Sequence, residues 1–338
     1  DTPLGSWRGR AVTDSAVSFL EGVTAAVGPE VEVRYAQGAP IAVGERSFVS
    51  ELQINTDDRS GFGEAVTATT GADVVLFAFG EEAFQSGEGR SQVDIGLAGV
   101  QHDLLRAILD VNPNVVGVLM TGRPLALPFE AEALPALLLT WHLGSQAGHA
   151  IADVVFGDHN PSGKLPVSFP RHVGQMPLYY NAKNTGRPAP PPSTGPPLVF
   201  WSHYTDSPNS ALFPFGHGLS YTRFEIGEPE ASSSTMERGG ELRISAAVKN
   251  TGDRAGTEVV QLYIRDLVGS TTRPVKELKD FRRVTLDAGA EAEVVFVLTE
   301  DDLAFHTARG AWGAEPGDFE VFVGGSSVDV RSTRFTLR

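Results

Sequence analysis

Residues 72–91 read ADVVLFAFGEEAFQSGEGRS, and this stretch decides how the chain folds. Its first half is a short, almost uninterrupted apolar run, which is typical of a strand buried on both faces of a parallel sheet. The loop that follows carries three carboxylates, three glycines and one arginine between Gly80 and Ser91. Such a loop leaves the carboxyl end of its strand, where open α/β folds bind their ligands. The loop therefore indicates either a catalytic segment or an ordinary solvated acidic loop.

The segment around this strand, residues 1–170, alternates helical and strand patterns. The spacing of apolar residues predicts helices over 15–27, 63–70, 100–111 and 146–156, with Asp14 as the cap of the first. Strands are expected over 31–35, 72–79, 115–120 and 136–141. Repeated βα units of this kind predict an α/β domain, with a mostly parallel sheet and helices on both faces.

The pattern changes twice after residue 170. Residues 171–222 lose their periodicity, and residues 187–197 read RPAPPPSTGPP, which is too rich in proline for a helix or an inner strand. We expect a polyproline II linker there, or an active-site loop, because long loops in compact proteins are often functional. Residues 223–338 carry short alternating runs at 241–248, 258–264, 293–297 and 319–323. These runs, separated by turn signals, predict an all-β immunoglobulin-like sandwich.

The composition excludes several functional classes. The 338 residues exceed one typical domain, and they carry a formal net charge of −15 from 27 basic and 42 acidic residues. This charge argues against binding to nucleic acid or to an anionic membrane, both of which need a basic surface. The chain has no cysteine, which excludes disulfides and thiolate chemistry. His142 and His149 have no clustered carboxylates around them, so we expect no metal site.

Several long motifs carry a resemblance to a known family. They read LMTGRPL at 119–125, WHLGSQAG at 141–148, FGDHNPSGKLP at 156–166, NTGRP at 184–188 and FPFGHGLSY at 213–221. Together with the acidic loop, they resemble the C-terminal portion of family-three glycoside hydrolases, in the bacterial β-glucosidase branch. The sandwich resembles the fibronectin type III-like domain that ends many of these enzymes. The resemblance implies a retaining exo-β-glucosidase that hydrolyses terminal non-reducing β-D-glucosyl residues without a cofactor.

The resemblance also assigns catalytic roles. Retaining glycosidases use two carboxyl groups about 5–5.5 Å apart, one as nucleophile and one as general acid/base. The family's acid/base maps onto Glu88, and the glycines on either side would let its side chain swing. Glu82 is the second candidate, because it lies nearer the end of the strand. Arg90 is expected to orient Glu88 or to keep it ionised, with a salt bridge inside the loop as the alternative.

Four further residues are candidates for substrate binding. Trp7 matches a family position near the sugar, where its ring would stack on a pyranose; a buried core tryptophan is the alternative. Arg123 follows a strand end and is either a cleft residue or a structural ion-pair residue. Asn184 and Arg187 lie among aromatic residues and are expected to reach an active site in the same subunit or in a neighbour.

Finally, the resemblance implies parts of the enzyme outside this chain. The nucleophilic Asp of the family lies on a preceding (β/α)8 barrel, and the first strand of the α/β domain comes just before the first residue here. We therefore expect the sheet to lack one strand, and the barrel and that strand to come from another polypeptide or a removed segment. The expected compartment is periplasmic or secreted, and a homodimer is compatible with the resemblance. The alternative from another class is a non-catalytic carbohydrate-binding or scaffold module, which has no need of the acidic loop.

Overall fold

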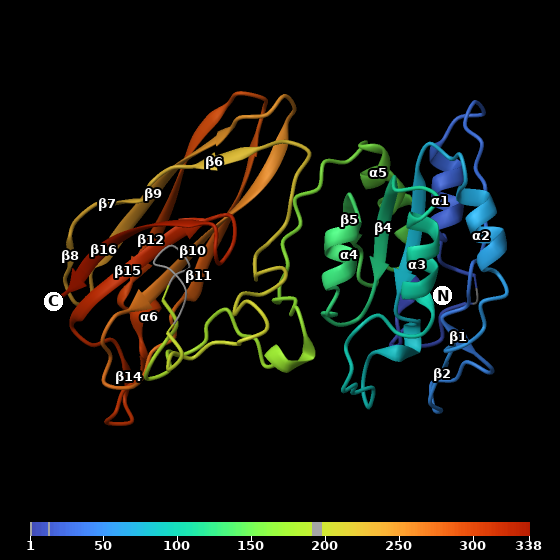
Figure 1. Cartoon of the computed structure of the whole chain (residues 1–338). Helices are drawn as coiled ribbons and strands as arrows, with labels where there is room; N and C mark the ends of the chain where they lie inside the picture. The colour runs from blue at the N-terminus through green and yellow to red at the C-terminus, as the bar shows by residue number, and fades with distance from the viewer. Residues whose placement is uncertain (1, 13, 191–197) are drawn as a thin grey trace. The chain divides into compact units, whose positions relative to one another are not determined.

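The computed structural model describes residues 2–12, 14–190 and 198–338. Its contacts divide the chain into two units, drawn in Figure 1: Asp1–His159 with Pro170–Met176, and Asn160–Phe169 with Pro177–Arg338. Most of the proline-rich run for which we expected a linker, residues 191–197, lies outside the described residues. Each unit is built around its own sheets and is described by itself.

The first unit contains a three-stranded parallel sheet in the order β3-β4-β5. Its strands are β3 (Val75–Gly80), β4 (Val115–Met120) and β5 (Ala136–Leu139). In β4, Val115, Val118 and Leu119 are almost completely buried, as expected for a central strand covered on both faces. The prediction of a parallel α/β sheet is confirmed. A separate two-stranded sheet joins β1 (Ala42–Val43) to β2 (Gln53–Ile54).

Helices cover both faces of the parallel sheet. They are α1 (Phe19–Ala26), α2 (Phe62–Thr69), α3 (Gln101–Leu109), α4 (Pro128–Ala133) and α5 (Ala147–Phe156). On one face, Ile151 of α5 packs with Val118 of β4, and Phe19 of α1 joins the same cluster. On the other face, α3 and α4 lie over the strands (Figure 1). The Gln101 side chain bonds both the N–H and the C=O of Gly80 at 2.9 Å, which ties the start of α3 to the end of β3.

Two local predictions in this unit are wrong. Residues 31–35 form no strand, because among the described residues no neighbouring strand supplies the hydrogen bonds that a strand requires, and Val31 and Val33 remain exposed. Asp14 does not cap α1, because the helix begins only after Ser18. The Ser18 hydroxyl accepts from the Glu21 N–H at 3.2 Å, and the Glu21 carboxylate accepts from the Ser18 N–H at 2.7 Å, which forms a complete capping box.

The second unit is a β-sandwich, as predicted, and its described strand pairs are antiparallel except for one short parallel pair. One sheet has the strand order β11-β10-β15-β16-β8, and the other has the order β12-β9-β6 with β7 also paired to β9. Phe296, Phe319 and Phe335 lie in the core shared by the two sheets. The strands are β6 (Phe224–Ile226), β7 (Glu230–Ala231), β8 (Thr235–Met236), β9 (Glu241–Asn250), β10 (Gly256–Asp266), β11 (Glu277–Leu286), β12 (Glu291–Thr299), β15 (Gly317–Gly324) and β16 (Val330–Leu337). A short helix, α6 (Glu300–Leu303), and a small hairpin of β13 (Phe305–His306) and β14 (Trp312–Gly313) complete the unit.

Candidate active site

The acidic loop starts with a close approach between two strands. Gly80 ends β3 with a φ of +130°, and a Cβ at this position would lie 2.0 Å from the Met120 carbonyl oxygen, so no other residue fits without strain. The next N–H, that of Glu81, donates to the same Met120 carbonyl at 2.8 Å. The loop therefore lies at the carboxyl edge of the sheet, beside the turn that follows β4.

Glu81 is locked inside this edge of the sheet. Its side chain is 2% exposed, and one carboxylate oxygen lies 2.8 Å from Nε of Arg123. The other oxygen accepts from the Thr121 hydroxyl at 2.8 Å and from the Gly122 N–H at 3.2 Å. A buried carboxylate with a cationic partner and two donors is fixed in place, so Glu81 is a structural residue of the loop.

Arg123 uses the rest of its guanidinium to hold the loop. Its Nη2 donates to the backbone carbonyls of Gln85 and Arg90, the latter at 2.8 Å. These two carbonyls stand on either side of Ser86–Gly89, so a single side chain fixes both ends of that segment. The contacts of Arg123 in this structure are those of a structural ion-pair residue, which was one of its two predicted roles.

Glu82 caps a short 3₁₀ turn, η2 (Ala83–Gln85). Its carboxylate accepts from the Phe84 N–H at 2.7 Å, while the Gln85 side chain accepts from the Glu82 N–H at 3.2 Å. The Arg46 guanidinium lies 3.8 Å from the other carboxylate oxygen. The Glu82 side chain is 4% exposed, so this second acid/base candidate sits in a buried cap.

Glu88 has a different environment from the other two carboxylates. It is exposed, and within the described parts of the chain no hydrogen bond or ion pair holds its side chain. The neighbouring Gly87 and Gly89 have φ values of +118° and +70°, which other residues rarely adopt. Arg90 does not pair with Glu88, because its Nη2 donates to the Phe48 carbonyl at 2.8 Å. Glu88 is thus a free carboxylate at the tip of a loop whose ends are fixed.

Aromatic side chains stand next to this tip. The predicted residue Trp7 is 66% exposed and is not a core tryptophan; its ring meets that of Phe48 edge to face, with centroids 5.5 Å apart. A Cβ placed on Gly87 would lie 3.7 Å from Nε1 of Trp7, so the indole borders the backbone directly before Glu88. Sequence reasoning missed Phe48, because its segment shows no periodicity and no recognisable motif.

Asn184 and Arg187 belong to the second unit, whereas the acidic loop belongs to the first. Both are exposed. The Thr185 hydroxyl accepts from the Arg187 N–H at 3.3 Å, and the Arg187 carbonyl accepts from the Ser202 N–H at 2.8 Å. The backbone of Arg187 is therefore held by local contacts.

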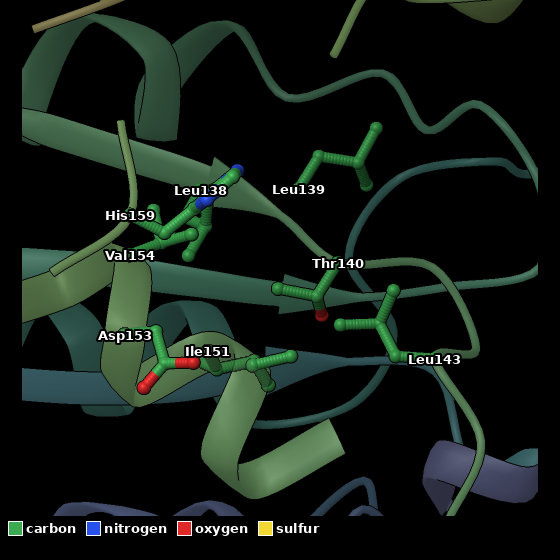
Figure 2. A pocket seen from close by; sticks show the side chains of 9 residues that line it. Leu138, Leu139, Thr140, Leu143, Ile151, Asp153, Val154 and His159 are labelled. Carbon is green, nitrogen blue, oxygen red and sulfur yellow. The ribbon is translucent and has the colours of Figure 1, made fainter. Parts of the chain in front are cut away.

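A hollow elsewhere in the first unit offers little chemistry. It has a volume of about 430 Å³ and lies between β5 and α5. Figure 2 shows Thr140 and Leu143 at one end of it and Leu138, Val154 and His159 at the other. Its walls are mostly leucine and other aliphatic side chains, and it shares no residue with the acidic loop. In the described residues there is no group of three or more His, Cys, Asp or Glu placed to hold a metal ion. None of the described helices combines the length and apolar character needed to cross a membrane.

Comparison with known proteins identifies the family and the two domains of the chain. Residues 1–221 match the glycosyl hydrolase family 3 C-terminal domain, and residues 258–327 match a fibronectin type III-like domain. This chain belongs to glycoside hydrolase family 3. The resemblance that the sequence motifs carried is confirmed.

Relatives in the family match almost the whole chain. A periplasmic β-glucosidase of Salmonella typhimurium is 42% identical over 99% of this chain and 44% of its own length. A β-xylosidase of Formosa agariphila is 38% identical over 95% of this chain and 42% of its own. The crystal structure of a β-glucosidase from Listeria innocua superposes with a TM-score of 0.87, at 36% identity, over 99% of this chain and 44% of that one. The chain therefore spans less than half the length of these family members and corresponds to their C-terminal part.

Proposed function

We propose that this chain supplies the general acid/base of a retaining exo-β-glucosidase, and that Glu88 is this residue. The observation that carries the proposal is the contrast within one loop. Glu81 and Glu82 are buried and bonded, whereas Glu88 is exposed, flanked by two glycines and free of partners in the described structure. A residue that must give and take a proton cannot be committed to a permanent ion pair.

The proposed reaction proceeds in two displacements. In the first, protonated Glu88 donates its proton to the glycosidic oxygen while a nucleophilic carboxylate attacks the anomeric carbon and the leaving group departs. In the second, ionised Glu88 takes a proton from water as the water oxygen attacks the same carbon and releases the sugar. The substrate would carry a terminal non-reducing β-D-glucosyl residue, as the names of the Salmonella and Listeria relatives suggest.

We infer that the nucleophilic Asp is supplied by a barrel domain outside this chain. This inference is supported by the 44% of the relatives' length that the chain spans. A separate observation concerns the sheet, since among the described strands β3 pairs only with β4 and its other edge has no strand beside it. An unprotected strand edge of this kind invites pairing, and we propose that the first strand of the domain, also outside this chain, pairs there. Following the Salmonella relative's name, the proposed location is the periplasm or the exterior of the cell.

The experiment that tests Glu88 compares two substrates whose leaving groups differ in their need for a proton. It uses the enzyme that contains both this chain and the barrel. Glu88→Gln should lower kcat/KM strongly for phenyl β-glucoside, whose leaving oxygen needs a proton, and much less for 2,4-dinitrophenyl β-glucoside, which leaves without one. General acid catalysis is typically worth about 10²–10⁴-fold, which sets the size of the expected loss. The pH–rate profile should also lose the limb that belongs to the acid.

Glu82→Gln is the matched control, because it alters a carboxylate of the same loop. It should lower activity equally for both substrates if Glu82 only caps the η2 turn. Equal losses for both leaving groups in Glu88→Gln, or a loss selective for phenyl β-glucoside in Glu82→Gln, would remove Glu88 from the proposed role.

A further inference from the structure

Trp141 has a strained backbone that determines where the next side chain, that of His142, lies. Thr140, directly after β5, still runs beside β4, because its N–H donates to the Leu119 carbonyl at 2.9 Å. Trp141 then adopts a φ of +46°, which a bulky residue rarely does. Strain of this kind is concentrated at functional sites, where the surrounding structure enforces it. Here it places His142 against Gly122, at the edge of the sheet from which the acidic loop leaves.

The His142 imidazole is enclosed and, when neutral, has a defined tautomer. Its Nδ1 lies 3.1 Å from the Thr2 carbonyl oxygen. Because a carbonyl oxygen can only accept, Nδ1 carries the proton and Nε2 is left as an acceptor. A Cβ added to Gly5 would lie 3.1 Å from the ring carbons Cγ and Cδ2, and one added to Gly122 would lie 2.9 Å from Nε2. The ring is therefore held between two glycine backbones.

The Nε2 acceptor of His142 is buried, and among the described residues no hydrogen bond reaches it. A buried acceptor without a donor costs free energy, which a donor within the protein would recover. The hydroxyl of Ser86 is placed to be this donor, since a Cβ added to Gly122 would also lie 2.0 Å from its Oγ, so that Oγ and Nε2 contact the same glycine. Ser86 is 5% exposed, and its hydroxyl has no hydrogen-bond partner in the described parts of the chain. Rotation about its Cα–Cβ bond moves the hydroxyl without moving the backbone.

Ser86 is separated from Glu88 by one glycine, so a bond to its side chain acts on the proposed general acid. A general acid has to lie within hydrogen-bond reach of the oxygen that it protonates. Gly87 allows many backbone conformations, and the last fixed point before it therefore limits where Glu88 can go. We propose that His142 is a positioning residue: its Nε2 accepts a hydrogen bond from the Ser86 hydroxyl, and this bond sets the position from which Glu88 gives its proton. The inference rests on the role of Glu88 proposed above.

The test replaces His142 in two ways in the enzyme that contains both this chain and the barrel. In His142→Asn the amide can still donate to the Thr2 carbonyl, but no atom remains at the place of Nε2. In His142→Gln the longer side chain returns an acceptor to that place. His142→Asn should lower kcat/KM for phenyl β-glucoside about two- to twelvefold, the equivalent of one neutral hydrogen bond of about 0.5–1.5 kcal/mol. It should leave kcat/KM for 2,4-dinitrophenyl β-glucoside unchanged, because that leaving group needs no proton, and His142→Gln should restore most of the loss.

A double-mutant cycle shows whether Ser86 and His142 act through one bond. Ser86→Ala should have the same selective loss as His142→Asn, and the second substitution should add nothing in the presence of the first. Losses that multiply in the double variant would overturn the proposal. So would equal losses for the two leaving groups, unchanged activity in His142→Asn, or the same defect in His142→Asn and His142→Gln.

His149→Asn is the control, because it makes the same substitution at an exposed position of α5. It should leave the hydrolysis of both substrates unaffected. The two hypotheses fail separately. Equal losses for the two leaving groups in Glu88→Gln refute the proposed function, whereas a selective loss in Glu88→Gln together with multiplying losses in Ser86→Ala and His142→Asn refutes only the positioning role.

Discussion

Replacing Arg123 by methionine should destabilise the first unit far more than the removal of any surface ion pair. Arg123 is the cationic partner of Glu81, whose side chain is 2% exposed, and it also holds the carbonyls of Gln85 and Arg90. Without it, Glu81 stays buried with only the donors of Thr121 and Gly122. Breaking a buried pair by removing one partner costs about 3–5 kcal/mol, because an uncompensated charge remains inside the protein.

The matched control is Arg34→Met. Arg34 and Glu32 also form a short ion pair, at 3.0 Å, but their side chains are 45% and 72% exposed. Exposed pairs contribute about 0–1 kcal/mol, so this variant should lose little stability. The two substitutions remove the same kind of side chain from the same unit. They differ in the burial of the ion pair and in the two loop carbonyls that Arg123 also holds.

The assay should report on the first unit alone, because a chain with two units need not unfold in one step. Hydrogen exchange of the β3 and β4 amides, followed as a function of urea, gives the free energy of opening of the sheet. A loss in Arg123→Met no larger than that in Arg34→Met would refute the reasoning about the stranded charge. The double variant Glu81→Leu, Arg123→Met should recover part of the loss, because it removes both charges together.

Three further predictions concern stability. Ser18→Ala should lower the free energy of unfolding by about 0.5–2 kcal/mol through loss of the α1 cap, whereas Asp14→Ala should leave the urea midpoint unchanged. A larger loss of stability in Asp14→Ala than in Ser18→Ala would contradict the capping box. Gly148→Ala should lower the free energy of unfolding by about 1–3 kcal/mol or more. The added Cβ would lie 2.0 Å from the Ser18 carbonyl oxygen, where α5 crosses the start of α1. An unchanged melting temperature would contradict this close contact. Burial lowers the pKa of Lys276 to about 8, so between pH 8 and the unfolded pKa of about 10.4 the unfolded state binds more protons and stability should rise with pH. Lys276→Met should flatten this rise in the thermal midpoint; a slope that survives the substitution would assign it to another group. Measurements should stay below about pH 10, since burial raises the pKa of Tyr263 and reverses the trend above the usual tyrosine value.

Much of the fold could be predicted because its signals are local. The apolar runs of β3 and β4 and the helical spacing of α3 and α5 each lie within one short window, and the structure places these elements within a few residues of the predicted bounds. The prediction of a strand over 31–35 was wrong because strand formation does not depend on local signals alone. Its alternation is suitable, but a strand also needs a neighbour, and the sequence window contains no information on whether one is present.

The site could be predicted only in outline. The family resemblance pointed to Glu88, and the glycines around it explained why a carboxylate there would be free. The partners of the other two carboxylates were not predictable, because Arg123 lies 42 residues beyond Glu81 and no local pattern links the two positions. Phe48 gave no signal either, since it became a candidate only when its exposure and its contact with Trp7 were known.

In the proposed function, the arrangement of the loop would also explain why it carries three carboxylates although the proposed reaction uses only one of them. The proposed general acid would have to reach a substrate bound to another domain, which requires a mobile tip, and to return to the same place in each turnover, which requires fixed ends. Glu81 and Arg123 fix the ends at Gln85 and Arg90, and the Glu82 cap keeps the first turn in shape. The exposed part of the loop is then Gly87–Gly89, where Glu88 lies between the two glycines. In this arrangement the carboxylates that are held in place are as necessary for the proposed chemistry as the one that is free, because they determine where Glu88 can go.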